Sequence, residues 1–600
     1  MDCSAIIQAV FITFCGEANN DNGKGYVLVR LLSLKLDGQY KGLKNQYFDF
    51  HCTQGNIVAL IGLNGSGKSQ LLELIAEVFA FLERTQRRDF KVKTPLGFGF
   101  ELTYQLGGTT DHSAGNPGME CGSPLAVAGG ISQPRFKVTL DQTSKEPSAF
   151  IWLADTWNEI RIEELELPFI VGYSSGQNEN LQRSFMKNAV QYFEVQRIRL
   201  KRRKELSGKL EDFQHAEINR QYLDKYPQIF SPTEGEAFEQ DGYLTLREAD
   251  TPISRAIYLD YDSAGLMLAC LAVLPADDVE HLLSEVTFKH PTRITLQYDL
   301  RGGVAEEDAI RDIKMLMRIA GENSFKPIGR EATSGQYDTY ELEYLAGQIT
   351  LDLTNQSVAA ELRESNYGDP ITLFRRLYKL QQLGVKNLQY ALRLQLQKDN
   401  FLGTVKKPLK SKLPLSITEL VLSDGNGRTV CLDDLSDGEA QLIEVLATAR
   451  IFSPERTLFL FDEPETHLNP SWRTYFHSHL SKAMVLSDNG EAQARVFLST
   501  HSPFMVSSLK KEDVLFFERD DEGLIKMEPV GSQTYGASFE VLIKSHFGLR
   551  SLISQTVVEA VKEYLPKDER PESLASAREW IEENLGDSME KAYLLRKLQS

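Results

Sequence analysis

The chain is predicted to adopt an α/β fold with a mostly parallel core sheet, and two kinds of pattern predict it. Apolar runs at residues 56–61, 457–461 and 496–498 are typical of strands buried on both faces of a parallel sheet. The first run leads into a glycine-rich loop at 62–69 and a helical pattern at 70–76. Strand, glycine loop and helix in this order form a common unit of such folds.

The glycine-rich loop reads Gly-Leu-Asn-Gly-Ser-Gly-Lys-Ser and has the spacing of a phosphate-binding loop. Its glycines let several backbone N–H groups turn toward one anion, and the helix that follows adds its positive N-terminal end. A ligand-free glycine turn is the alternative, which the flanking strand and helix disfavour. The residues predicted to bind nucleotide here are Gly62, Asn64, Gly65, Ser66, Gly67, Lys68 and Ser69.

Two acidic residues, Asp462 and Glu463, end the apolar run 457–461. A carboxylate at the carboxyl end of a central strand is where such folds hold Mg²⁺. We expect Asp462 to face the Mg²⁺, with Ser69 offering its hydroxyl, and Glu463 to orient and polarise the attacking water. A solvated acidic turn is the alternative, and it is less compatible with a complete phosphate loop upstream.

Two further segments complete the pattern. Residues 435–439, Leu-Ser-Asp-Gly-Glu, precede a helical run, and there Ser436 is a good helix cap and Gly438 permits close approach to an anion. His501 directly follows the strand-like run 496–498 and its polar end, where an imidazole can reach a phosphate. A lone histidine is more often structural, but the other three segments favour the functional interpretation.

In this order, the four segments resemble the ABC-type ATPases. The loop 62–69 corresponds to Walker A, and Asp462-Glu463 to Walker B with its catalytic glutamate. Residues 435–439 are similar to the signature motif, although Asp437 replaces the first of its two usual glycines and adds negative charge. His501 resembles the switch histidine. The resemblance therefore implies a P-loop NTPase of ABC type, with ATP and Mg²⁺ as cofactors.

The resemblance also implies a Q-loop glutamine after a core strand. Gln177, which follows the apolar run 169–173, is the candidate. It joins Glu463 and His501 as a catalytic residue, and Ser69 and Asp462 as a ligand of Mg²⁺. Residues 468–470 fall where the D-loop would lie, although their sequence departs from its common form.

Longer stretches are similar to soluble AAA-type ABC ATPases of phage-defence operons. Residues 462–470 and 499–503 look like the group that includes the ATPases of Septu and retron-linked systems. Residues 34–43 resemble ATPases associated with restriction systems, and 534–538 and 585–598 resemble the Septu-type tail. The resemblance implies an antiphage ATPase that controls a separate nuclease, with an HNH-type protein as the expected kind.

Composition limits the other functions. The formal net charge of −18, from 66 basic and 84 acidic residues, argues against an extensive basic surface for nucleic acid but leaves room for a local patch. Six cysteines lack the spacing of a zinc site or a disulfide framework, which indicates a reducing cytoplasm. No run of apolar residues reaches membrane-spanning length. We therefore expect a cytoplasmic protein that contacts no membrane.

Four parts are predicted along the chain. They are an N-terminal ABC ATPase lobe at 1–190, a large, mainly helical insertion at 191–415, a C-terminal ABC ATPase lobe at 416–520 and a helical tail at 521–600. Alternating patterns at 98–104, 135–140 and 150–153 predict an antiparallel β subdomain in the first lobe. A hairpin is predicted around Asp424-Gly425-Asn426-Gly427, between 415–422 and 429–432.

Three stretches in or next to the insertion have further patterns. The run 256–274 is expected to be an apolar, helical core segment. Residues 188–210 are expected to form a helix that bears Arg197, Arg199, Lys201, Arg202, Arg203 and Lys204. Either this helix presents a solvated charged face, or it contacts a nucleic acid or an acidic partner. Lys406, Lys407, Lys410 and Lys412 form a second basic patch, which is expected to be a linker.

The expected mechanism is a head-to-tail homodimer, or a higher even-numbered oligomer. Each nucleotide would lie between the P-loop of one protomer and Ser436 and Gly438 of the other, because the signature helix has no phosphate to bind within its own chain. Nucleotide binding would close the dimer and hydrolysis would release it. A built-in nuclease is not expected. Two alternatives stay open: a RecF- or SMC-like ATPase that acts directly on DNA, and a sensor that binds ATP with little hydrolysis.

Overall fold

The structure, a computed structural model, describes residues 29–107, 134–175, 180–208, 210–233, 244–248, 251–260, 263–301, 307–321, 324–328, 346–406, 412–485, 494–548, 554–565 and 570–598. The predictions for Gln177 and for Lys407 and Lys410 concern residues outside these ranges. The chain forms two compact units, Met1–Tyr535 and Gly536–Ser600.

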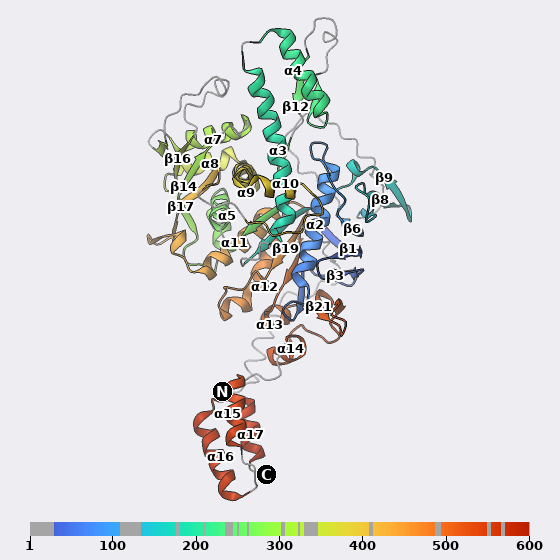
Figure 1. Ribbon diagram of the computed structural model, residues 1–600. Helices are drawn as coiled ribbons and strands as arrows, with labels where there is room; N and C mark the ends of the chain where they lie inside the picture. Colours follow the sequence, from blue (N-terminus) through green and yellow to red (C-terminus); the bar gives the residue numbers. More distant parts are fainter. Residues whose placement is uncertain are drawn as a thin grey trace. The chain divides into compact units, whose positions relative to one another are not determined.

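A seven-stranded sheet forms the core of the first unit (Figure 1). In spatial order its strands are β13 (Ala256–Asp260), β10 (Phe169–Ser174), β19 (Thr457–Asp462), β20 (Arg495–Ser499), β5 (Ile57–Gly62), β21 (Val514–Arg519) and β22 (Ile525–Pro529). Every neighbouring pair is parallel except β21 and β22. The predicted parallel core is confirmed. Because β10, β19, β20 and β5 are adjacent, the segments that follow them emerge at one edge of the sheet.

The predicted antiparallel β subdomain is also present, as a six-stranded sheet. Its strands, in spatial order, are β4 (Tyr47–Asp49), β1 (Val29–Asp37), β6 (Gly99–Leu106), β7 (Arg135–Leu140), β8 (Ser148–Leu153) and β9 (Thr156–Ile160). A two-stranded ribbon, β2 (Gln39–Tyr40) and β3 (Leu43–Lys44), follows β1.

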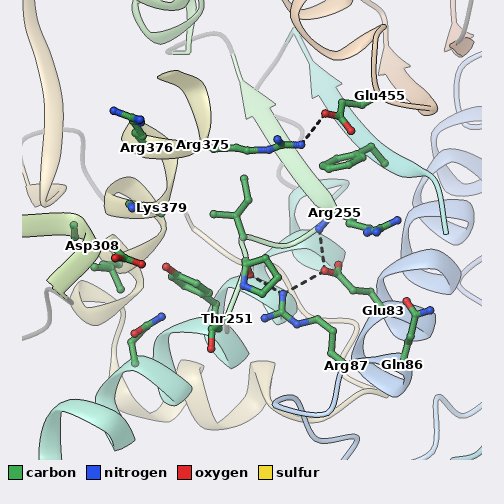
Figure 2. Close-up of a pocket in the computed structure, with 17 residues that line it drawn as sticks. Glu83, Gln86, Arg87, Thr251, Arg255, Asp308, Arg375, Arg376, Lys379 and Glu455 are labelled. Atoms are coloured by element: carbon green, nitrogen blue, oxygen red, sulfur yellow. Dashed lines mark hydrogen bonds and ion pairs between the residues drawn. The ribbon is translucent and has the colours of Figure 1, made fainter. Parts of the chain in front are cut away.

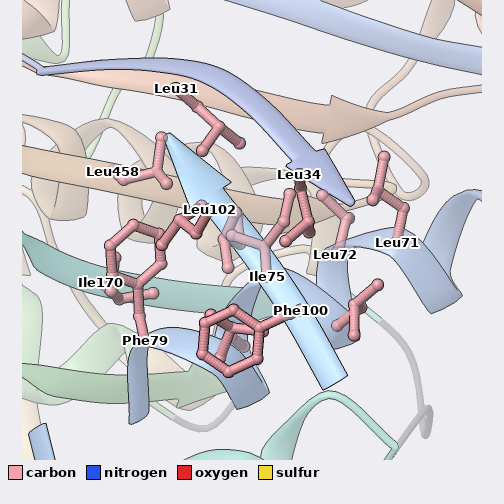
Figure 3. Packing of buried hydrophobic residues seen from close by; sticks show 14 of the residues in the cluster. Leu31, Leu34, Leu71, Leu72, Ile75, Phe79, Phe100, Leu102, Ile170 and Leu458 are labelled. Carbon is pink, nitrogen blue, oxygen red and sulfur yellow. The ribbon is translucent and has the colours of Figure 1, made fainter. Parts of the chain in front are cut away.

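Helix α2 (Lys68–Gln86) packs between these two sheets. Its Ile75 and Phe79 are buried with Leu34 of the antiparallel sheet and with Ile170 and Leu458 of the core sheet (Figure 3). Apolar residues that recur along both faces of this helix account for its burial on two sides. The helix that starts at the P-loop is therefore fixed by the main hydrophobic core.

The segment 191–415 is richer in strands than predicted. A five-stranded antiparallel sheet has the order β15 (Phe325–Pro327), β16 (Ala346–Asp352), β14 (His290–Asp299), β17 (Leu415–Ser423) and β18 (Thr429–Cys431). The pairing of β17 with β18 confirms the predicted hairpin. Helices of this segment are α5 (Ala264–Leu271), α6 (Ala276–Leu282), α7 (Glu307–Ala320), α8 (Gln356–Ser365), α9 (Pro370–Gln382) and α10 (Tyr390–Leu396).

The run 256–274 was predicted to be one helix, but the structure divides it into a strand and a shorter helix. Its first residues form β13, which joins the core sheet beside β10, and only Ala264–Leu271 are helical, as α5. A short apolar run is ambiguous between a buried strand and a buried helix, and here the free edge of a parallel sheet selects the strand. The prediction therefore assigned a core strand, β13, to a helix.

The predicted basic helix is α3 (Gln182–Leu206), which runs from the core to α4 (Asp212–Lys225) (Figure 1). Next to it lies the ribbon β11 (Phe230–Pro232) and β12 (Leu246–Glu248). Arg202 Nη1 lies 3.1 Å and Arg203 Nη2 2.7 Å from carboxylate oxygens of Glu248, and Arg199 Nε lies 4.0 Å from the same group. These three arginines hold the ribbon against α3, so they are not free to form a nucleic-acid surface.

Three more helices complete the first unit: α11 (Asp437–Phe452), α12 (Pro470–Met484) and α13 (Pro503–Ser507). Single 3-10 turns occur at Ile162–Glu164, Leu383–Asn387, Leu432–Asp434 and Lys511–Asp513. The second unit contains α14 (Phe539–His546), α15 (Gln555–Tyr564), α16 (Pro571–Asn584) and α17 (Met589–Lys597). In it the rings of Tyr564 and Trp580 stack with centroids 4.3 Å apart. Among the described residues, no helix combines the length and the apolar character that a bilayer crossing requires.

Buried ion pairs join α2 to α3. Glu77 of α2 accepts hydrogen bonds from Lys187 Nζ at 2.7 Å and Ser184 Oγ at 2.8 Å, and Arg84 Nη2 lies 3.3 Å away. Arg84 also donates to Asp399 Oδ1 at 2.9 Å and to Asn188 at 2.6 Å. Burial opposes ionisation of Glu77, but Lys187 and Arg84 outweigh it and lower its pKa to about 2. The buried side chains of Glu77, Lys187 and Arg84 therefore stay charged because they pair with one another.

Replacing Arg84 with Met is expected to lower the free energy of unfolding by about 3–5 kcal/mol, because two buried carboxylates lose a partner. Arg84 is 1% exposed in its side chain. Chemical denaturation measures the change. Arg197→Met is the control, since that side chain is 58% exposed and its ion pair with Glu194 contributes at most about 1 kcal/mol. Equal effects of the two substitutions would contradict the structural role of this cluster.

Candidate nucleotide-binding site

The P-loop connects β5 to α2, and its glycines are required by the neighbouring strands. Gly62 has φ +140°, and a Cβ there would lie 2.2 Å from the carbonyl oxygen of Phe517 on β21. Gly67 has φ +105°, and its Cβ would meet side-chain carbons of Ile525 at 2.7 Å. Neither position accepts an L side chain. Contacts with β21 and β22 therefore require glycine at two positions of the loop. The sequence alone does not reveal this constraint.

Lys68 lies inside the loop rather than in solvent. Its Nζ donates to the carbonyl oxygens of Gly62 at 3.0 Å and Leu63 at 3.1 Å. Burial lowers the pKa of Lys68, while Glu463 and Asp462 oppose that shift. Burial removes part of the hydration of the ammonium group, and a nearby polyanion would stabilise its charge. Lys68 is therefore suited to bind a nucleotide phosphate.

Ser66 provides a second observation that fits a phosphate. Its hydroxyl is buried and has no hydrogen-bond partner in the part of the chain that the structure describes. Buried hydroxyls without partners are uncommon, and they require an explanation when they occur. A phosphate oxygen in the loop would supply the missing partner. The P-loop of this chain therefore matches the group that its sequence pattern implies.

Asp462 and Ser69, which are far apart in the sequence, meet as predicted. Ser69 Oγ donates to Asp462 Oδ1 at 2.8 Å, and Ser499 Oγ donates to the same oxygen at 2.5 Å. Mg²⁺ typically keeps several waters and binds through one or two protein groups and the phosphates. One carboxylate and one hydroxyl therefore suffice. Consistent with this, the described part of the chain holds no group of three or more His, Cys, Asp or Glu side chains placed to bind a metal ion.

Glu463 adopts a backbone conformation that is rare for residues other than glycine. Its φ is +53°, and its N–H donates to Ser499 O at 3.2 Å and to Ser499 Oγ at 3.1 Å. Burial and the neighbouring Asp462 raise the pKa of Glu463, while Lys68 opposes that shift. A strained residue with a raised carboxyl pKa, just after the magnesium-side acid, fits the role of a general base.

His501 lies beside Glu463, with Nε2 3.6 Å from Glu463 Oε1. Burial and the positive charge of Lys68 lower the pKa of His501, while Asp462 opposes them. These effects favour the neutral imidazole, which can accept or donate a hydrogen bond without adding a charge. The sequence analysis did not predict this contact with Glu463; the expected role of His501, reaching a phosphate, stays a prediction.

The signature segment begins α11. Ser436 caps this helix: its Oγ accepts from Glu439 N at 3.3 Å, while Glu439 Oε2 accepts from Ser436 N at 3.1 Å. Ser436 and Asp437 are exposed, whereas Gly438 is buried, and a Cβ there would lie 2.9 Å from His467 O. The glycine is thus needed for contact with the loop after Walker B, and the exposed helix start faces solvent.

Several residues that the sequence analysis missed connect these motifs. Gln441 Oε1 accepts from His467 N at 2.8 Å, which ties the signature helix to the Walker B loop. Ser175, at the end of β10, donates through Oγ to Thr466 Oγ1 at 3.2 Å. Glu465 is buried and bonded to Thr500, and burial raises its pKa to about 7. A buried carboxyl of this kind is poorly placed as the base, in contrast to the 43% exposed side chain of Glu463.

Two predicted assignments stay predictions. Gln177 lies outside the described residues, although the end of β10 that precedes it lies beside Walker B, where Ser175 N donates to Asp462 O at 3.4 Å. In the segment proposed as the D-loop, Asn469 caps α12 by accepting from Trp472 N at 2.9 Å, and Pro470 is the first helical residue. That role is structural and does not test a role at the dimer interface.

Together the fold and the site define a P-loop NTPase fold of ABC type. Residues 350–507 match the family described as "AAA domain, putative AbiEii toxin, Type IV TA system". This match includes the signature, Walker B and His501 segments. No curated protein matches the chain.

Solved structures of SMC heads match most of the chain. One is the SMC head bound to the C-winged helix domain of ScpA, at 11% identity and TM-score 0.29, with 83% of this chain and 97% of that chain covered. Another is the SMC head domain from Thermotoga maritima, at 10% identity and TM-score 0.27, with 84% and 100% covered. Both likenesses are low in identity and in TM-score, so the fold class stands on the geometry described above.

The pH dependence of ATP turnover should report the ionisation of Glu463. As a base, Glu463 must be ionised, and its pKa is raised, so the rate should fall with decreasing pH at values above the ordinary carboxyl pKa of about 4.3. Steady-state rates between pH 5 and 8 measure this. Glu463→Gln should slow turnover about 10²- to 10⁴-fold and remove the acid limb, whereas His501→Asn should retain it. An acid limb that survives in Glu463→Gln would assign the base to another residue.

Proposed function

We propose that this protein hydrolyses ATP to ADP and phosphate in a composite site formed by two copies of the chain. The observation that carries the proposal is the convergence of Lys68, Ser69, Asp462, Glu463 and His501 at one edge of the core sheet. Lys68 and the loop would bind the phosphates, and Ser69 and Asp462 would hold Mg²⁺. The bound Mg²⁺ would neutralise charge that develops on the transferred phosphoryl group.

Within the site, the chain's own residues have separable roles. Glu463 would orient a water and accept its proton on a carboxylate oxygen. His501 would hold Glu463 and sense the γ-phosphate from the opposite side. Ser499 fixes both acids, because its hydroxyl donates to Asp462 while its backbone and side-chain oxygens accept from Glu463 N. Positioning of this kind supplies most of the catalysis in phosphoryl transfer.

A second copy would complete the site through its signature helix. Ser436 and Asp437 are exposed at a helix N-terminus that carries a partial positive charge. Such a helix start, which Gly438 keeps close to the Walker B loop, suits contact with a nucleotide held by another protomer. A head-to-tail dimer would bury two nucleotides, and its closure would depend on their presence.

The composite site can be tested by complementation between two inactive variants. Lys68→Ala removes the main cation of the P-loop, and Ser436→Asp keeps a good helix cap but adds a charge that repels phosphate. Each variant alone should lose ATP turnover. Co-expressed with different tags, they should regain about a quarter of wild-type turnover, since half of randomly formed dimers hold one intact site.

Two controls make this result interpretable. Ser436→Asn, which caps the helix without a charge, should retain most activity. Light scattering with and without Mg-ATP should show a dimer that the slow variant Glu463→Gln traps. Full activity of Ser436→Asp would exclude the signature from the site, and no recovery on mixing would contradict a shared site.

We further propose that closure of the dimer controls a separate nuclease, of HNH type, in antiphage defence. The resemblance of residues 462–470 and 499–503 to ATPases of defence operons supports it. The matched family description, which names a putative toxin of a toxin–antitoxin system, also fits a protein that controls a harmful activity. In this proposal ATP binding sets the state of the dimer, and the partner responds to that state.

Plating efficiency of phages on cells that carry the gene with its neighbouring genes tests this role. Protection is expected with the wild-type chain and is expected to be lost with Lys68→Ala, because the dimer can no longer close on nucleotide. Glu528→Gln, an exposed substitution on β22, is the control. Unchanged plating with every phage tried would count against defence. Salt-dependent DNA binding by the purified protein that ATP strengthens would instead support an ATPase acting on DNA.

A further inference from the structure

A cavity of about 770 Å³ lies at the other end of the core sheet from the nucleotide site. Phe169, the first residue of β10, lines it, together with Arg255, which immediately precedes β13, and Glu455, which lies two residues before β19. The P-loop and Asp462 lie at the carboxyl ends of these parallel strands. Strands of about six residues separate the two regions by roughly 20 Å, so the cavity is distinct from the P-loop site.

Basic side chains predominate in the cavity wall (Figure 2). The cationic lining residues are Arg87, Arg255, Arg375, Arg376 and Lys379, and the acidic ones are Glu83, Asp308 and Glu455. Figure 2 shows them approaching from α9 on one side and from α2 and residues 251–255 on the other. Arg87 pairs with Asp89, Arg375 with Glu455, and Arg376 and Lys379 with Asp312, so among the described residues Arg255 is the lining cation without an acidic partner, and it favours an anionic ligand.

Two of the guanidinium groups are held in place by one aromatic ring. Arg255 lies 5.8 Å and Arg375 5.7 Å from the ring centroid of Phe169. Arg375 also donates to Glu455 at 2.8 Å, whereas Arg255 Nη1 donates to the carbonyl oxygen of Leu167 at 2.6 Å. Within the described ranges, no ion pair joins Arg255 to a carboxylate. Its charge is therefore oriented but not neutralised, as an anion-binding arginine requires.

The acid nearest to Arg255 is satisfied by the wall itself. Glu83 accepts hydrogen bonds from Arg255 N at 2.9 Å, from Ser254 Oγ at 2.6 Å and from Asn188 Nδ2 at 2.8 Å. Because these donors surround its carboxylate, Glu83 repels an incoming anion less than an open carboxylate would. Glu83 thus shapes the wall and leaves the guanidinium group of Arg255 available, while Arg375 keeps its ion pair with Glu455.

Gln196 of α3 supplies an independent sign of a missing ligand. It lines the cavity and is 1% exposed, yet among the described residues neither its amide nitrogen nor its amide oxygen has a hydrogen-bond partner. Thr251, also in the wall, has a buried hydroxyl that likewise lacks a partner within the described part of the chain. Leaving such groups unpaired is costly, so their presence in a native cavity requires an explanation. A ligand that both donates and accepts hydrogen bonds would provide it.

We propose that this cavity binds a small phosphorylated metabolite with a heterocyclic head group, of which a nucleoside monophosphate is the simplest member. Arg255 and Arg375 would bind the phosphate. Gln196 would pair with the edge of the base, because an amide presents one donor and one acceptor side by side. The volume is in the range of sites that enclose small molecules. The ligand would be separate from the ATP that the P-loop binds.

Direct binding measurements in a Lys68→Ala background test the proposal, since that substitution silences the P-loop. AMP, GMP, CMP and UMP are the probes, with inorganic phosphate for comparison, in equilibrium dialysis. At least one nucleotide should bind more tightly than phosphate. Gln196→Leu should weaken that nucleotide about tenfold or more and leave phosphate unchanged. Arg255→Met should weaken both.

The Gln196→Leu variant also guards against a trivial loss of fold. It replaces an unpaired buried amide with an apolar side chain of similar size, so its melting temperature should equal or exceed that of the parent. Arg220→Met, at an exposed position on α4, is the charge control and should leave binding unchanged. Absence of binding by all four nucleotides at millimolar concentration would overturn the proposal. So would nucleotide binding that neither Gln196→Leu nor Arg255→Met weakens.

Discussion

The pairing of carboxylates on α2 with cations on α3 is the interaction on which the other parts of this structure depend. Helix α2 begins at the P-loop and ends beside the cavity wall, so it is in contact with both ligand-binding regions. Its Glu77 and Arg84 are buried, and among the described residues their side-chain partners are each other, side chains of α3 and Asp399. Through Asp399, the segment 191–415 thereby contributes to the buried core around α2.

Local patterns predicted which side chains of the candidate site lie together. The P-loop, Asp462, Glu463 and His501 each follow a buried strand, and parallel strands necessarily place such residues at one edge. The pattern could not predict contacts that join distant segments. Gln441, which supports the loop at His467, and the carbonyl of Phe517, which excludes a side chain at Gly62, have no signal in their own surroundings.

The fold was predictable where periodicity was unambiguous and was not where it was short. Alternation identified the six-stranded antiparallel sheet and the β17–β18 hairpin. By contrast, Ala256–Asp260 form a strand only because β10 offers a free edge, which is a tertiary condition. The five-stranded sheet of the insertion was missed because its strands come from segments far apart in the chain. The arginines of α3 looked like a surface patch because their partner, Glu248, lies about one helix and one loop away.

The left-handed backbone of Glu463 has an evolutionary consequence. A non-glycine residue at φ +53° costs of order 1 kcal/mol or more, and glycine would relieve that strain at the same position. Mutational drift toward greater thermodynamic stability would therefore favour loss of the side chain that we propose as the general base. Selection for turnover has to act against this tendency. Inactive descendants of this chain that retain nucleotide binding should therefore arise by few mutations. They should also fold at least as stably as their parent.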